Sequence, residues 1–203
     1  MYKHTKRSID IVFALLFAML LCPVYTIISV LVLIFLGRPV LYCQQRIGRG
    51  GKVFNLYKFR SMTNDRDASG NLLEEEKRIT KFGAILRSSS LDELPELYSI
   101  LNGDMSFVGP RPLPAYYQQY FLPHELKRHE VRGGLIPPDG LSGETTPTWE
   151  KQFEYDLYYV ENMSFFLDTK IIFATFGIIV KRILNNYGAE CRPHLNDYRK
   201  SNK

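Results

Sequence analysis

The sequence is constrained most by an uncharged hydrophobic segment, residues 11–36, close to the N-terminus. A helix that crosses a membrane needs about 20 predominantly apolar residues, and this run is long enough. A cleavable signal peptide would have an apolar core of roughly 7–15 residues followed by small residues. This run is longer and ends in the bulky sequence LVLIFL. We therefore expect the chain to be attached to a membrane.

Pro23 lies in the middle of this segment and leaves two arrangements open. A proline inside a helix removes one backbone hydrogen bond and crowds the preceding turn. A kinked span tolerates this where neighbouring groups satisfy the freed carbonyl. The alternative is a helix, a break and a second helix that leaves the membrane on the side where it entered. Basic residues flank both ends of the segment, so the positive-inside rule gives no orientation. These residues are Lys3, Lys6, Arg7, Arg38, Arg46 and Arg49.

The charge and the cysteine content limit the partners. The net charge of +5 and the isoelectric point near 9.0 favour an anionic partner, such as nucleic acid, an acidic membrane or a phosphorylated small molecule. The chain has no recognisable nucleic-acid-reading motif and does have a membrane segment, which argues against nucleic acid. Three cysteines without CxxC spacing indicate neither a disulfide framework nor a zinc site. His124 and His129 are five residues apart, which is the wrong spacing for one helix face. This spacing argues against a metal site formed by histidines.

The segment after residue 37 begins with a predicted β-hairpin, VLYCQQRIGRGGKVFNLYKFRSM, in which glycines mark the turn. Lys58 and Arg60 are two residues apart, so in a strand they share a face about 7 Å from each other. Such a pair is commonly a solvated basic edge. It is also spaced to hold a diphosphate.

Residues 88–112 read SSSLDELPELYSILNGDMSFVGPRP and contain two adjacent acids, Asp92 and Glu93. Ser90 and Glu93 have the spacing of a capping box at the start of a helix. Pro95 conflicts with that start, because an interior proline costs about 3 kcal/mol and a cap contributes about 1 kcal/mol. Proline suits the first position of a helix, which would leave the two acids just before it. The alternative is a kinked helix that keeps the capping box. The two acids therefore either cap this helix or take part in chemistry.

Arg111 follows in a segment, VGPRPLP, that its prolines make stiff and extended. A stiff segment can present an arginine to an anion, although a rigid linker is the commoner use. The later stretch YYQQYFLPHELKRHE is aromatic on one side and basic on another. It could lie on a membrane surface, or against a partner or the core. Residues 149–184 predict one or two helices, whose apolar part is too short to cross a membrane and is interfacial or buried.

Several blocks closely resemble the bacterial sugar transferases, the monotopic phosphoglycosyl transferases. They are KFRSM, LRSSSLDELPEL, NGDMSFVGPRP and WEKQFEYDLYYVENMSFFLD, in the family order, and the resemblance covers essentially the whole chain. It implies an α+β, mostly helical fold with a re-entrant helix broken at Pro23 and a small β-hairpin. Residues 1–37 would be the membrane-associated segment. Residues 38–203 would be a catalytic domain with interfacial amphipathic helices, on the cytoplasmic face of the bacterial inner membrane.

The resemblance also implies a reaction. The family moves a sugar 1-phosphate from a UDP-sugar to polyprenol (undecaprenyl) phosphate and releases UMP, the first membrane step of glycoconjugate assembly. By match to the family's acidic pair, Asp92 is the nucleophile that carries the phosphosugar, and Glu93 is its partner. Asp92 also helps to hold the required magnesium. The candidates for binding the substrate phosphates are Lys58, Arg60, Arg87 and Arg111.

One stretch departs from the family pattern. Members often carry a PGxTG-like loop, whereas this chain has GGLIPPDGLSG, with Ser142 in place of the threonine. The sugar, the glycan pathway, the oligomeric state and the role of Glu93 stay open. A second hypothesis is an inactive, membrane-anchored basic module that binds anionic lipid. It explains the charge and the hydrophobic segment, but not LDELP close to GPRP.

Overall fold

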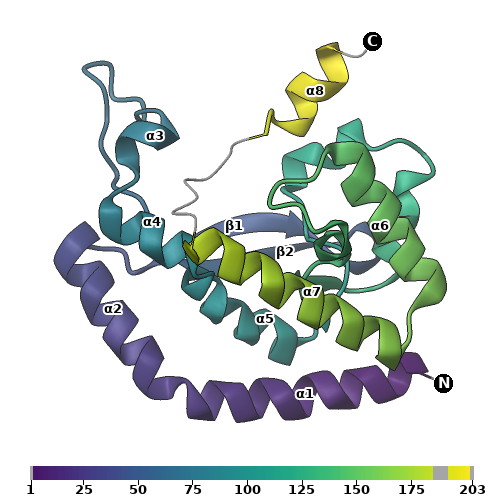
Figure 1. Ribbon diagram of the computed structural model, residues 1–203. Helices are drawn as coiled ribbons and strands as arrows, with labels where there is room; N and C mark the ends of the chain where they lie inside the picture. Colours follow the sequence, from purple (N-terminus) through teal and green to yellow (C-terminus); the bar gives the residue numbers. More distant parts are fainter. Residues whose placement is uncertain (1, 185–191, 202–203) are drawn as a thin grey trace.

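The N-terminal segment is a pair of helices, α1 (Tyr2–Leu20) and α2 (Cys22–Leu36), which bend by 61° at their junction. The computed structural model describes residues 2–184 and 192–201. Pro23 lies in the first turn of α2, where a missing backbone N–H costs little. Within the described residues no single helix is long and apolar enough to cross a membrane, although the bent pair together meets both criteria. The expected break at Pro23 is confirmed (Figure 1).

Both ends of this helix pair are bound to the rest of the chain. Near the start of α1, Lys6 forms a buried ion pair with Asp168 of α7 (Phe165–Leu184), at 2.6 Å between Nζ and Oδ2. Arg7 donates a 2.7 Å hydrogen bond to the carbonyl of Ile100. After the end of α2, Arg60 donates to the carbonyl oxygens at 36–38. The two ends of the pair are therefore held against one body (Figure 1).

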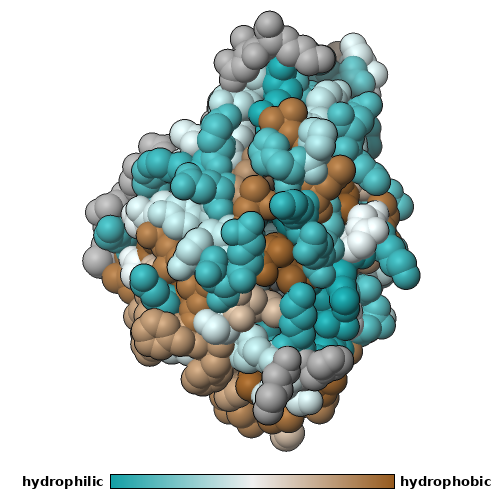
Figure 2. Space-filling model, turned by 90° about the vertical axis from the view of Figure 1, so that its right-hand side faces the viewer, coloured by the Kyte–Doolittle hydropathy of each residue, from teal (hydrophilic) through white to brown (hydrophobic). Residues whose placement is uncertain are grey.

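Most of the outer surface of the pair is apolar and exposed. The exposed large apolar side chains of α1 and α2 are Val12, Phe13, Leu15, Leu16, Phe17, Met19, Leu20, Ile27, Val30, Leu33, Ile34 and Phe35. Hydrophobic residues gather at the lower end of the molecule, where α1 lies (Figures 1 and 2). Monomeric soluble proteins rarely expose apolar patches of this extent, so this surface needs an apolar neighbour.

The predicted hairpin is present. Strands β1 (Leu41–Ile47) and β2 (Val53–Phe59) pair in antiparallel register from Leu41↔Phe59 to Ile47↔Val53, and a short 3-10 helix, η1 (Arg49–Gly51), forms the turn. A second, parallel pair of strands was not predicted: β3 (Met105–Val108) beside β4 (Gly133–Ile136). At this pair the backbones approach so closely that a Cβ on Gly134 would lie 2.1 Å from the nitrogen of Gly109.

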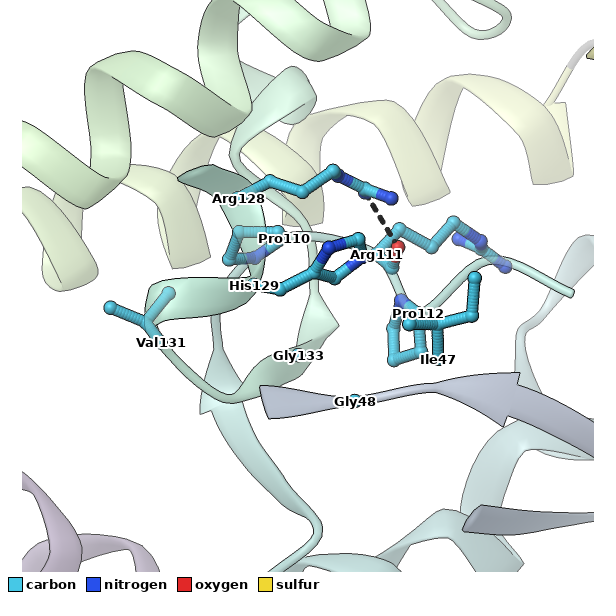
Figure 3. Close-up of a pocket in the computed structure, with 9 residues that line it drawn as sticks. All are labelled: Ile47, Gly48, Pro110, Arg111, Pro112, Arg128, His129, Val131 and Gly133. Carbon is cyan, nitrogen blue, oxygen red and sulfur yellow. Dashed lines mark hydrogen bonds between the residues drawn. The ribbon is translucent and has the colours of Figure 1, made fainter. Parts of the chain in front are cut away.

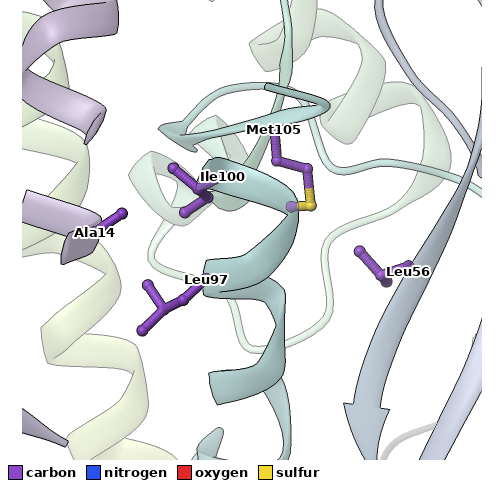
Figure 4. Packing of buried hydrophobic residues seen from close by; sticks show 5 residues of the cluster. All are labelled: Ala14, Leu56, Leu97, Ile100 and Met105. Carbon is purple, nitrogen blue, oxygen red and sulfur yellow. The ribbon is translucent and has the colours of Figure 1, made fainter. Parts of the chain in front are cut away.

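Short helices connect the hairpin to the parallel strands. They are α3 (Glu75–Arg78), α4 (Lys81–Ser88), the 3-10 helix η2 (Leu91–Glu96) and α5 (Leu97–Asn102). One buried hydrophobic cluster joins α1, β2, α5 and β3. Its members are Ala14, Leu56, Leu97, Ile100 and Met105 (Figure 4). The division of the chain at residue 37 stays a prediction, but α1 shares this core with the segments that follow.

The aromatic and basic stretch 116–130 does not form one amphipathic surface helix. It forms the 3-10 helices η3 (Ala115–Tyr120) and η4 (Glu125–Glu130), in which Tyr117 and Arg128 are buried. Tyr117 packs with Trp149 of α6 (Trp149–Asn162) and with Leu195 of α8 (Leu195–Ser201). Of the alternatives, the structure therefore favours a core face.

Helix α7, by contrast, has two different faces. It buries Leu167 and Ile171 in a core cluster and exposes Phe166, Phe173 and Phe176. The atypical stretch, residues 133–143, comprises strand β4 and the 3-10 helix η5 (Pro138–Ser142). Helix α7 is thus amphipathic, as an interfacial helix must be. Its contact with a membrane stays a prediction.

Candidate active site

The acidic pair lies in a 3-10 helix and not in the first turn of an α-helix. Ser90 adopts the left-handed conformation, with φ 56°, and its side chain makes no capping hydrogen bond. Pro95 lies inside η2, and the α-helix begins only at Leu97. The capping box is therefore wrong, and so is the placement of Pro95 at the first helical position. The physical reason is that Glu93, the other half of the box, binds basic side chains instead of the backbone.

Glu93 joins two cations that come from distant parts of the chain. Its Oε1 lies 2.5 Å from Nζ of Lys58, on β2, and 2.7 Å from Nη2 of Arg111, in the GPRP segment. Glu96 approaches Lys58 as well, at 3.1 Å. Burial alone would raise the pKa of Glu93, but the charges and hydrogen bonds of Lys58 and Arg111 outweigh it and lower the pKa. Glu93 is thus an ionised carboxylate that orients two cations.

Asp92 is buried beside Glu93 and its two cations but is not part of their ion pairs. Its exposed fraction is 8%, and no described residue forms a hydrogen bond or an ion pair with its carboxylate. Burial and the neighbouring Glu93 charge raise its pKa, whereas Lys58, Arg87 and Arg111 act in the opposite direction. An uncommitted carboxylate near three cations can bind a metal ion or attack an anionic substrate.

Of the predicted phosphate-binding residues, Lys58 and Arg111 are beside the acids. Arg87, on α4, is close enough to lower the pKa of Asp92, and its Nε donates a 2.9 Å hydrogen bond to Oγ of Ser61. Arg111 has the most accessible side chain of this group, 43% exposed, against 32% for Arg87 and 17% for Lys58. These three residues form the cationic side of the candidate site.

Arg60 is not part of this group. Its guanidinium donates to the carbonyl oxygens of Gly37 and Arg38, each at 2.7 Å, and so caps the C-terminal end of α2. Strand β2 ends at Phe59, so the alternation of side-chain directions along a strand does not extend to Arg60. Arg60 therefore need not lie on the same face as Lys58. The expectation that Lys58 and Arg60 hold a diphosphate together is therefore corrected: Arg60 fixes the N-terminal helix pair to the hairpin.

Three contacts of the site were missed from the sequence. Glu96 is one, although its place in LDELPE could have marked it. Tyr25 of α2 is another, because its hydroxyl donates to the carbonyl of Leu94 and so links the N-terminal helix pair to η2. The third is the buried pair of Arg128 and Asp156 behind Arg111. Charged residues of this kind look like surface residues in a sequence, so no local signal marks the pair.

The donor set around Asp92 is compatible with magnesium but does not form a complete cage. Among the described residues there is no group of three or more histidine, cysteine or acidic side chains that could hold a metal. Magnesium in phosphoryl-transfer sites is typically bound by one or two carboxylates, with substrate phosphates and water completing the shell. The uncommitted carboxylate of Asp92 fits that pattern.

A small cavity of about 10 Å³ lies beside Arg111. Neither acid of the pair lines it: the lining comes from the hairpin at Ile47 and Gly48, from residues 110–112, and from residues of η4 and β4 (Figure 3). A volume of this size holds one water at most. The cavity therefore belongs to the support of Arg111 and not to substrate binding.

The sequence profile described as "Bacterial sugar transferase" matches residues 1–182. An uncharacterized sugar transferase, EpsL of Bacillus subtilis, is 42% identical over 94% of this chain and 92% of that relative. The UDP-N-acetylgalactosamine-undecaprenyl-phosphate N-acetylgalactosaminephosphotransferase of Aeromonas hydrophila is 34% identical, over 93% of this chain and 45% of the relative. The UDP-glucose:undecaprenyl-phosphate glucose-1-phosphate transferase of Klebsiella pneumoniae is 40% identical, over 84% of this chain and 39% of that relative. The chain thus spans nearly all of the first relative and less than half of the other two.

Proposed function

This chain belongs to the bacterial sugar transferase family, and we propose that it transfers a sugar 1-phosphate from a UDP-sugar to undecaprenyl phosphate. The relatives named for this reaction support the two substrate classes. The observation that carries the proposal is Asp92: a buried, uncommitted carboxylate whose pKa responds to Lys58, Arg87 and Arg111. An inactive lipid-binding module would have no use for such a group.

The proposed chemistry has two displacements at one phosphorus atom. In the first, an Asp92 oxygen bonds to the phosphorus that carries the sugar, and the bond from that phosphorus to the bridging oxygen breaks. UMP leaves with the electron pair, and the sugar phosphate remains on the carboxylate. In the second, an oxygen of the lipid phosphate attacks the same phosphorus and releases Asp92 unchanged. The product is a polyprenyl-diphosphate sugar, and no proton is consumed overall.

The cations address the main obstacle to this chemistry, which is the approach of an anion to an anionic diphosphate. Catalysis of phosphoryl transfer consists largely of positioning and of stabilising the charge on the transferred group. Arg111 is stiffly presented and partly exposed, so it is the first candidate to bind the diphosphate, with Lys58 and Arg87 beside it. Magnesium held by Asp92 and by substrate phosphate oxygens would supply further positive charge there. Glu93 keeps Lys58 and Arg111 directed toward Asp92.

The membrane segment brings this site to a lipid substrate. We propose that α1 and α2 enter and leave the bacterial inner membrane on the cytoplasmic side, where the rest of the chain lies. The contacts at Lys6, Arg7 and Arg60 support this topology, since both ends of the pair bind the same body. The Tyr25 contact to Leu94 supports it further, because it keeps η2 next to the apolar segment.

Cysteine labelling tests the topology. In a chain whose native cysteines are replaced, Lys3→Cys and Arg38→Cys should both react with a membrane-impermeant maleimide from the cytoplasmic side of sealed vesicles. Both positions are exposed and flank the apolar run. Lys52→Cys, in the exposed hairpin turn, is the reference for the cytoplasmic side. Labelling of the first two positions from opposite sides would establish a full span and exclude re-entry.

The reaction itself is tested by UMP release. A panel of UDP-sugars is incubated with the purified protein, undecaprenyl phosphate and magnesium, and one of them should give UMP and a lipid-linked sugar diphosphate in equal amounts. The panel is needed because the loop that contains Ser142 departs from the family pattern. A protein that binds anionic vesicles but releases no UMP from any donor would support the lipid-binding module instead.

A further inference from the structure

A buried ion pair lies directly behind Arg111. Arg128, on η4, and Asp156, on α6, are 2% and 0% exposed. The Nε and Nη2 atoms of Arg128 lie 3.0 and 2.7 Å from Oδ2 of Asp156. The guanidinium is also 5.6 Å from the ring centre of Phe121 and 5.4 Å from that of Phe153. Buried ion pairs can often be replaced by apolar side chains without loss of stability. Stability alone therefore does not explain this pair, and its other contacts indicate a second role.

The Arg128 guanidinium also contacts the backbone of Arg111. Its Nη2 also donates a 2.8 Å hydrogen bond to the backbone carbonyl of Arg111 (Figure 3). The bonds to Asp156 and the two aromatic rings fix the guanidinium, so its position determines where the carbonyl of Arg111 lies. One charged group thus connects α6 to the backbone of the residue whose side chain reaches Glu93.

The surroundings leave the Arg111 backbone little room to move. Pro110 and Pro112 flank it in the sequence and restrict its conformations. Packing is tight next to it, because a Cβ on Gly133 would lie 2.5 Å from Cγ of Pro112. The cavity of about 10 Å³ on this side has room for one water at most. A change at Arg128 is therefore passed on to Arg111 and is not absorbed by empty space.

We propose that Arg128, held by Asp156, is a positioning residue that sets the place of the Arg111 guanidinium relative to Glu93 and the donor diphosphate. This inference rests on the proposed transferase function. Arg128 itself stays 2% exposed and does not reach substrate. Its influence on the reaction passes through Arg111 alone, and a displacement of about 1 Å at a reacting site can cost on the order of 100-fold in rate.

A double-mutant cycle tests this coupling through the initial rate of UMP release. Arg128→Lys keeps a positive charge beside Asp156 but lacks the planar fork that reaches Asp156 and the carbonyl together. In the otherwise wild-type protein we expect it to lower the rate about 10- to 100-fold. In an Arg111→Ala background, where no guanidinium remains to be positioned, the same change should lower the rate by less than about threefold.

Matched variants separate positioning from general stability. Arg132→Lys is the control, because Nε of Arg132 also donates to a backbone carbonyl, that of Gly103 at 2.7 Å, and Gly103 belongs to neither the acidic pair nor the GPRP segment. We expect its rate to stay close to wild type. Thermal unfolding in detergent is measured for every variant. If Arg128→Lys does not fold, Asp156→Asn takes its place in the cycle, since it removes the charge that holds Arg128.

The outcomes are distinct. Equal losses from Arg128→Lys, or from its substitute, in both backgrounds would overturn the positioning role and leave a structural one. A loss in the wild-type background that nearly vanishes with Arg111→Ala supports the proposal. An absence of UMP release by the wild-type protein with every donor would instead overturn the proposed function, and this inference with it.

Discussion

Asp92→Asn should abolish UMP release, with a loss of roughly 10⁴-fold or more, because the amide cannot form the covalent bond to phosphorus. The side chain keeps its size, and in the described structure it has no hydrogen bond or ion pair to lose. The protein should therefore fold and insert normally. A radiolabelled UDP-sugar gives the second measurement: wild-type protein without lipid acceptor should retain label after denaturation, and the variant should retain none.

Asp104→Asn is the matched control for this prediction. Asp104 lies just before β3 and accepts a hydrogen bond from the side chain of Asn102, which is not a residue of the candidate site. Its variant should release UMP at nearly the wild-type rate. Full activity of Asp92→Asn would refute the nucleophile assignment, whereas loss of membrane insertion in that variant would show a structural role for the carboxylate.

The parts of the fold that local sequence determines could be predicted. The charge-free run and Pro23 gave the broken helix, because hydrophobic length and a missing backbone donor act within a few residues. The glycine-rich turn at 48–51 gave the hairpin for the same reason. The parallel pairing of β3 with β4 could not be predicted in this way. These strands are short and are joined through the two 3-10 helices of residues 115–130, so their contact depends on tertiary packing.

The candidate site shows the same limit. The run LDELP was recognisable, but its conformation was not, because the capping box and the ion pairs of Glu93 compete for one carboxylate. The ion pairs prevail because Lys58 and Arg111 are brought there by β2 and by the stiff GPRP segment. Arg60 shows the converse case: two residues from Lys58 in sequence, it binds a helix end instead of the site.

Glu93→Gln should lower the rate of UMP release by about 10²- to 10³-fold while the nucleophile remains intact. Glutamine keeps the size of the side chain and one acceptor oxygen, but it loses the charge that attracts Lys58 and Arg111. Both cations then gain freedom to leave the position beside Asp92. The measurement is the initial rate with saturating donor, together with the fraction of enzyme that carries the phosphosugar when lipid acceptor is absent.

Glu96→Gln is the matched comparison, since Glu96 lies on the same 3-10 helix and contacts Lys58 but has no ion pair with Arg111 in the described structure. Its loss should be no more than about tenfold, because Glu93 still holds both cations. In a Lys58→Met background the effect of Glu93→Gln should shrink, since one of the two cations that it orients is already gone. A Glu93→Gln protein that forms the phosphosugar adduct at the wild-type rate, but does not pass it to the lipid, would contradict this role. It would place Glu93 in the second displacement, where the acceptor phosphate attacks.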